Sequence, residues 1–191
     1  MAEPGAAPQR PALPRLRLRP TMLSDLAYVQ SVEQDARNLP FITPWERTQH
    51  EAAVRIPDFR HFIVEGDAGA KVGAGASAPV GEDAVARDGF VILQGCRNPN
   101  RSVGRACVRQ LKRLAFDDLR AHRFWLDVKS LNTRALALYA DEGFVEEGRL
   151  RESVRLGGLG GLGEEAGYDT LVVMSLLDRE YRARQALGLE A

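Results

Sequence analysis

Apolar and polar side chains alternate with a period of two in several short segments, which is the pattern of strands with one buried face. Leucines alternate with arginines over residues 15–19, and Phe124, Leu126 and Val128 share one side of the segment 123–129. An uninterrupted apolar run over 89–93 predicts a strand buried on both faces. The segments expected to form strands are residues 15–19, 62–65, 71–78, 89–93, 123–129, 144–147 and 171–177.

Other segments repeat apolar residues every three or four positions, which is typical of a helix that packs on a core through one face. Val108, Leu111 and Leu114 form such a face. Arg109 and Lys112 fall on the opposite face. The segments expected to form helices are residues 24–37, 48–56, 104–119 and 132–142, together with the residues after 178.

Strands and helices alternate along the chain, and strand–helix–strand units occupy its second half. This order predicts an α/β or α+β protein with one domain. Proline-rich residues 1–14 are expected to form a disordered leader, residues 15–178 the domain, and residues 179–191 a helical or disordered tail. The glycine-rich stretch 157–167 is expected to be a mobile connection.

Composition excludes several classes of function. The 191 residues include 26 basic and 26 acidic side chains, so no net field attracts nucleic acid or an acidic membrane. Cys96 and Cys107 lack the spacing of a metal or redox site, and His50, His61 and His122 are too scattered to predict a metal site. No apolar run approaches the roughly 20 residues that span a bilayer. We therefore expect a cytoplasmic protein that binds no metal, nucleic acid or membrane.

One motif carries specific chemistry. Directly after the expected strand 123–129, Asn132, Ala135, Leu138 and Tyr139 precede Gly143-Phe144. Asn132 and Tyr139 are two helical turns apart and project from nearly the same face, with the small Ala135 between them. This motif resembles that of the GCN5-related N-acetyltransferase (GNAT) superfamily. Residues 146–151 and 168–175 resemble the last strands of the branch that acetylates ribosomal-protein N-termini or spermidine.

The resemblance implies a fold and an activity. The fold is a central, mixed, mostly antiparallel twisted sheet of about six or seven strands flanked by helices. The activity is transfer of an acetyl group from acetyl-CoA to a primary amine, by direct attack through a tetrahedral intermediate. Tyr139 would act as general acid toward the departing thiolate, and Asn132 would contact the pantetheine arm. The acceptor would be a small amine or a protein N-terminus, and the chain a monomer or homodimer.

The expected pyrophosphate cradle is irregular. The family pattern Q/R-x-x-G-x-G/A is met by Arg101, Gly104 and Ala106, and the resemblance assigns cofactor binding to Arg101, Val103, Gly104, Arg105, Ala106, Asn132, Ala135 and Tyr139. A second register of the pattern places Pro99, which lacks an N–H, in the cradle. Either residues 90–93 themselves form the central strand, in a shortened form, or a strand and most of the cradle are missing.

Alternatives remain for each feature. Asn132 also suits the cap of the helix it precedes, and Tyr139 also suits a half-buried aromatic position. The general base is open, with Asp88, Glu82, Glu46 and Glu33 as candidates by charge alone. The alternative function is a non-catalytic binding or regulatory module of the same fold with an impaired pyrophosphate loop.

Overall fold

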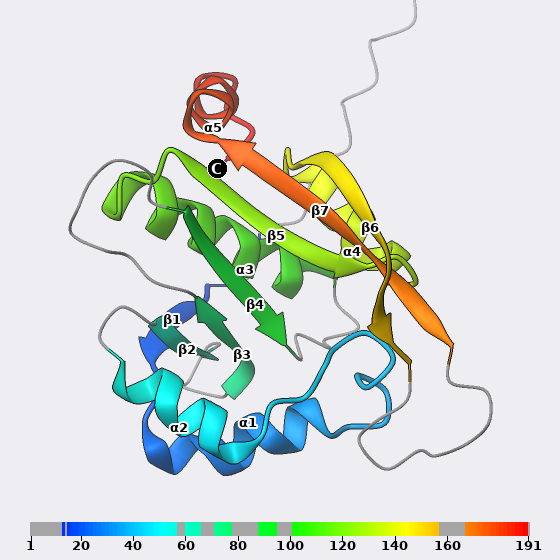
Figure 1. Ribbon diagram of the computed structural model, residues 1–191. Coiled ribbons are helices and arrows are strands. Elements are labelled where there is room, and N and C mark those ends of the chain that lie inside the picture. The colour runs from blue at the N-terminus through cyan, green and yellow to red at the C-terminus, as the bar shows by residue number, and fades with distance from the viewer. Residues whose placement is uncertain are drawn as a thin grey trace, which may run out of the picture.

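The computed structural model describes residue 13 and residues 15–56, 60–65, 71–77, 88–94, 101–156 and 167–190 (Figure 1). Its helices are α1 (Leu26–Glu33), α2 (Arg47–Arg55), α3 (Arg101–Arg113), α4 (Thr133–Asp141) and α5 (Asp178–Ala186). Its strands are β1 (Arg17–Pro20), β2 (Arg60–Glu65), β3 (Lys71–Ser77), β4 (Asp88–Gln94), β5 (Arg123–Lys129), β6 (Val145–Arg155) and β7 (Tyr168–Leu177). Each predicted strand and helix has a counterpart, although β6 is much longer than its short apolar start indicated. The predicted leader and the connection 157–166 lie outside the described residues.

The strands form one seven-stranded sheet in the order β1-β2-β3-β4-β5-β7-β6. Neighbouring strands are antiparallel except β4 and β5, which are parallel. The mixed, mostly antiparallel sheet expected from the resemblance is therefore confirmed. The run over 89–93 belongs to the central strand β4, and β4 is not shortened, since β4 and β5 have seven residues each.

The sheet separates two layers of helices (Figure 1). On one face, Val108 and Leu111 of α3 pack with Leu126 of β5, Leu176 of β7 and Tyr181 of α5 in the main core. On the other face, Val29 of α1 packs against Ile63 of β2. Alternate residues of β2 and β5 therefore face different helical layers, as the period of two requires.

The polar residues of α3 are not all exposed to solvent. Arg109 and Lys112 are buried because their side chains reach Glu142 at the end of α4. Lys112 also forms an ion pair with Glu190 at 2.5 Å. Glu190 belongs to the segment after α5, which lies over this face of α3. A sequence pattern shows which positions are polar, but not that distant acidic residues will cover them. Among the described residues, no helix is long and apolar enough to cross a membrane.

Candidate active site

The central strands separate along their length. The parallel pairing of β4 with β5 covers Asp88–Phe90 and Arg123–Trp125 and then stops. Both strands continue, to Gln94 and Lys129, and Figure 1 shows them diverging toward these ends. Backbone groups on the facing edges beyond Trp125 thus have no partner strand between β4 and β5. Such an edge can bind an extended ligand as an added strand would.

Helix α4 begins where β5 ends and places the predicted motif beside this divergence. Asn132 caps the helix, because its side-chain oxygen accepts a hydrogen bond from the Ala135 N–H at 3.2 Å. Seven residues on, Tyr139 is half-buried and packs edge-to-face on Phe144 with ring centroids 5.7 Å apart. Gly143 ends the helix with a φ of 95°, which explains the glycine there. The capping role of Asn132 is therefore present and uses one lone pair of its side-chain oxygen.

The start of α3 packs beside the same helix. A Cβ on Gly104 would lie 3.3 Å from a methyl group of Leu138, so the glycine allows α3 to approach α4 closely. The helix begins at Arg101, so the N–H groups of Arg101, Ser102 and Val103 have no acceptor within the helix itself. Such groups, together with the helix dipole, bind anions. The N-terminal part of α3 and helix α4 are thus neighbours.

The remaining residues assigned to the cradle have other contacts. Arg105 directs its guanidinium to Asp141 and Glu142 at 2.8 and 3.1 Å. Ala106 is buried against the protein interior. Their backbone N–H groups fall within the helix, so the first turn of α3 carries the available donors.

The opposite face of β5 looks toward the α1–α2 layer. Trp125, Asp127 and Lys129 alternate with the core residues and lie on this face. Lys129 donates to the Ile42 carbonyl at 3.0 Å and so ties the segment between α1 and α2 to the end of β5. Burial lowers the pKa of Lys129, although Asp169 opposes this shift. The segment over residues 34–46 therefore borders the divergence on the side away from α4.

A buried polar chain holds this segment from the other end. Glu33 accepts from His50 at 3.0 Å and from the Trp45 N–H at 3.0 Å. The second ring nitrogen of His50 lies 3.2 Å from His61, whose other nitrogen lies 2.8 Å from the Thr21 hydroxyl. Burial, with the nearby His50, lowers the pKa of His61 to about 4, against a smaller opposing effect of Asp25.

The sequence contained no sign of this chain, because its members come from separate parts of the sequence between residues 21 and 61. The sequence spacing indicated scattered histidines. In the structure His50 and His61 are in contact, with ring centroids 5.3 Å apart. Their nitrogens bond in a line rather than converging, and no group of three or more His, Cys, Asp or Glu among the described residues is arranged to hold a metal.

The general-base candidates named by charge are placed very differently. Glu33 is buried within the polar chain, and Glu46 is exposed at the start of α2. Only the backbone of Asp88 is described, at the paired end of β4, and Glu82 lies outside the described residues. Asp127, which sequence analysis did not single out, lies on β5 two residues beyond Trp125, the last residue paired with β4.

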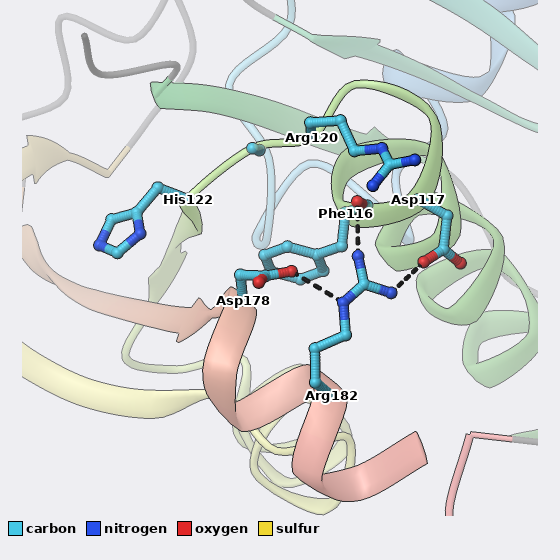
Figure 2. A pocket seen from close by; sticks show the side chains of 7 residues that line it. Phe116, Asp117, Arg120, His122, Asp178 and Arg182 are labelled. Carbon is cyan, nitrogen blue, oxygen red and sulfur yellow. Dashed lines mark hydrogen bonds and ion pairs between the residues drawn. The ribbon is translucent and has the colours of Figure 1, made fainter. Parts of the chain in front are cut away.

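A pocket of about 510 Å³ lies at the other end of β5 (Figure 2). Arg182 extends from α5 between Asp117, Asp178 and the Phe116 carbonyl and bonds all three. The charged groups that line the pocket are thus largely paired with one another. The pocket also adjoins His122, which lies before the start of β5. The strands diverge at the opposite end of β5, so this pocket is not the site that the fold builds between them.

This architecture and site define a class of enzyme. The model of the acetyltransferase (GNAT) family matches residues 26–144, so the chain belongs to that family. It is therefore an acyltransferase that uses acetyl-CoA. No protein among the curated sequences matches it.

The chain is also similar to solved structures of a spermidine N-acetyltransferase, SpeG, from Vibrio cholerae. A chimera of that enzyme with hSSAT has a TM-score of 0.74 at 21% identity, covering 88% of this chain and 99% of that one. The complex with CoA and spermine has a TM-score of 0.72 at 20% identity, covering 87% and 98%. A dodecameric form has a TM-score of 0.70 at 20% identity, covering 88% and 97%. At this identity the similarity shows the fold.

Proposed function

We propose that this chain transfers the acetyl group of acetyl-CoA to a primary amine, on a small cationic substrate or a protein N-terminus. The observation that carries the proposal is the parallel pairing of β4 and β5 that stops after Phe90 and Trp125. Polyamines are a reasonable first class of acceptor, because a structural neighbour was solved with CoA and spermine.

The described residues fit acetyl-CoA in two respects. The N–H groups of the first turn of α3, which have no acceptor within the helix, suit its pyrophosphate. The edges of β4 and β5 that do not pair with each other suit the amide groups of its pantetheine arm. Arg101 and Val103 would contribute backbone donors, and Gly104 would keep α3 close to α4. When bound, acetyl-CoA supplies an activated thioester carbonyl.

The face of α4 supplies groups for the reacting end. Asn132 has an amide NH₂ and a second lone pair beyond its capping bond, which suits a contact to the pantetheine arm. Ala135 leaves room for a ligand chain along the helix. Tyr139 stands two turns further on, about 10 Å along the helix axis at 1.5 Å per residue. Its hydroxyl would donate a proton to the leaving sulfur.

Replacement of Tyr139 with Phe tests this assignment. The ring stacking on Phe144 survives the change, so the fold and the dissociation constant for acetyl-CoA should stay near wild type. Turnover should fall about 100-fold, because the proton donor is lost. Tyr168→Phe removes a hydroxyl from an exposed tyrosine at the start of β7 and is the matched control.

Calorimetric titration with acetyl-CoA separates the possible failures. Binding together with an unchanged rate and pH profile for Tyr139→Phe would remove Tyr139 from the mechanism but leave the acetyltransferase. Absence of heat at millimolar acetyl-CoA would favour the non-catalytic module, in which the cradle no longer binds the pyrophosphate.

A further inference from the structure

A short turn joins the end of β5 to α4, and the start of β7 holds this turn in place. The Asn132 N–H donates to the Lys129 carbonyl at 2.8 Å and closes the turn. The Ser130 N–H donates to the Thr170 carbonyl at 2.8 Å, and the Ser130 hydroxyl donates to the Asp169 carboxylate at 2.6 Å. The residue that caps α4 is therefore placed by bonds from β7 as well as by its own helix.

Asp169, near the start of β7, is only 5% exposed. The oxygen that accepts from Ser130 also accepts from the Thr170 N–H, at 2.7 Å. Burial by itself would raise the pKa of Asp169, but the hydrogen bonds from Ser130 and the neighbouring backbone, with the charge of Lys129, outweigh burial and lower that pKa. The carboxylate is therefore ionised at neutral pH, although solvent hardly reaches it.

Lys129, at the end of β5, is a cation on which this carboxylate acts. It is 7% exposed, and burial lowers its pKa because the ammonium form is poorly solvated. The charge of Asp169 opposes that shift. The ammonium group donates to the Ile42 carbonyl at 3.0 Å, in the segment over residues 34–46. Asp169 thus favours the charged form of the group that ties this segment to β5.

We propose that Asp169 is a positioning residue for the transfer reaction. Through Ser130 it orients the start of α4, the helix that carries Tyr139. Through Lys129 it holds the segment over residues 34–46, on the side of the divergence away from α4. The inference rests on the proposed function and deepens it. One buried carboxylate holds the helix on the acetyl-CoA side and the segment on the acceptor side, without touching either substrate.

Ser130→Ala tests the contact with α4, because it removes the hydroxyl and leaves the carboxylate. We expect kcat to fall about 10-fold with KM for the amine unchanged, since a small misplacement of Tyr139 slows proton transfer to the leaving sulfur. Ser130→Thr keeps a hydroxyl and should retain most of the wild-type kcat. Ser153→Ala removes an exposed hydroxyl that bonds the Leu150 carbonyl, and it is the matched control.

Lys129→Met tests the contact with the segment over residues 34–46. Methionine keeps an apolar stem but cannot donate to the Ile42 carbonyl, so the segment must be ordered when the amine binds. KM for spermidine and for a peptide with a free N-terminus should rise about 10-fold. The kcat and the dissociation constant for acetyl-CoA should stay near wild type.

Substitutions of Asp169 itself should combine these effects in a defined way. Asp169→Asn removes the charge but keeps an oxygen that accepts from Ser130, so it should resemble Lys129→Met. Asp169→Ala removes both and should lower kcat/KM for the amine about 100-fold. In the Asp169→Ala background, Ser130→Ala and Lys129→Met should each add less than about a 2-fold loss, because the contacts they remove are already broken. Asp118→Asn, at an exposed position, is the control for a lost carboxylate.

A residue that only stabilises the fold would reduce the fraction of active enzyme, leave KM for the amine unchanged and give losses that multiply in the double variants. That result in an active wild type would overturn the inference alone. If Asp169→Ala does not fold, Asp169→Asn and the single variants decide. The same kinetic profile in Ser130→Ala and Lys129→Met, or wild-type kinetics in Asp169→Asn, would then contradict it. A wild type that binds acetyl-CoA but acetylates neither acceptor would overturn the proposed function and the inference together.

Discussion

Two buried glutamates, one on each side of the sheet, solve the problem of a charge in the protein interior in opposite ways. Glu142, at the end of α4, is bonded by Lys112 at 2.8 Å and by Arg109 and Arg105 at 3.1 Å. Glu33, at the end of α1, has the His50 ring and the Trp45 N–H as partners of one oxygen. Its other oxygen is buried without a hydrogen-bond partner among the described residues.

The two arrangements respond differently to pH. Burial alone would raise the pKa of Glu142, but the bonds and charges of Lys112 and Arg109 outweigh it and lower that pKa. No lysine or arginine among the described residues is bonded to the Glu33 chain, which continues through His50 to His61, a residue that burial keeps neutral. The Glu142 cluster therefore fixes α3, α4 and the chain end as a rigid support. The Glu33 chain holds the segment over residues 34–46 through the Trp45 N–H and includes His61, whose pKa is lowered by burial.

The largest effect is expected from breaking the compensated cluster. Lys112→Met keeps most of the buried volume but removes the cation between Glu142 and Glu190, both of which stay buried. The free energy of unfolding should fall by about 3 to 5 kcal/mol, measured by urea denaturation. Arg149→Met breaks an exposed ion pair with Glu146 and should leave the free energy of unfolding nearly unchanged. Equal effects of the two substitutions would contradict the contrast between buried and exposed pairs.

The uncompensated chain should make stability depend on pH. His61 binds a proton near pH 6.5 in the unfolded chain but only near pH 4 in the folded one. The unfolded state thus binds more protons between these values, and stability should fall as pH drops from about 6.5 to about 4. The full effect of such a shift is about 3 kcal/mol.

The comparison that isolates this residue is His61→Phe. Between pH 7 and pH 5.5 its free energy of unfolding should fall less steeply than that of the wild type, whatever its absolute stability. His122→Gln removes an exposed histidine and should keep the wild-type slope. A wild-type slope in His61→Phe would show that the pH dependence arises elsewhere.

The smallest effect is expected at Thr21, the last member of the buried polar chain that starts at Glu33. Thr21→Val keeps the shape of the side chain but removes the hydroxyl bonded to His61, leaving a ring nitrogen without its partner. Stability should fall by about 1 kcal/mol. Thr48→Val, at an exposed position of α2, is the matched control and should change stability by less than about 0.5 kcal/mol. A loss no larger than that of the control would mean that the hydroxyl is dispensable to the chain.

Much of the architecture was predictable from local patterns. The period of two gave β5 its bounds, Arg123–Lys129, and the motif from Asn132 to Phe144 predicted α4 with its cap and its glycine stop. These signals are local, because capping, helix termination and alternation depend on residues a few positions apart. The same motif indicated the GNAT family, and the match to that family's model shows that the chain belongs to it.

The polar contacts of the interior were not predictable in this way. In the sequence, Arg109 and Lys112 form the polar side of a helix. Only the fold brings Glu142 and Glu190 over them. The sequence spacing of His50 and His61 gives no sign of a contact between them. The packing of α2 on β2 brings the two rings together. Each of these pairs joins residues from different elements, and burial then decides whether a charge is stabilised by an ion pair or carried by a titratable chain.

The sequence by itself determined the order of strands and helices, the helix α4 and the residues at its two ends, because those features depend on short-range backbone preferences. Only the tertiary structure decided that β4 and β5 part after three residue pairs. It also decided that Asp127 lies beside the point where β4 and β5 separate and forms no ion pair with a described cation. Glu33 does not lie beside that point. The reason is physical: the desolvation and pairing of a carboxylate depend on everything packed around it, and most of those neighbours come from distant parts of the chain.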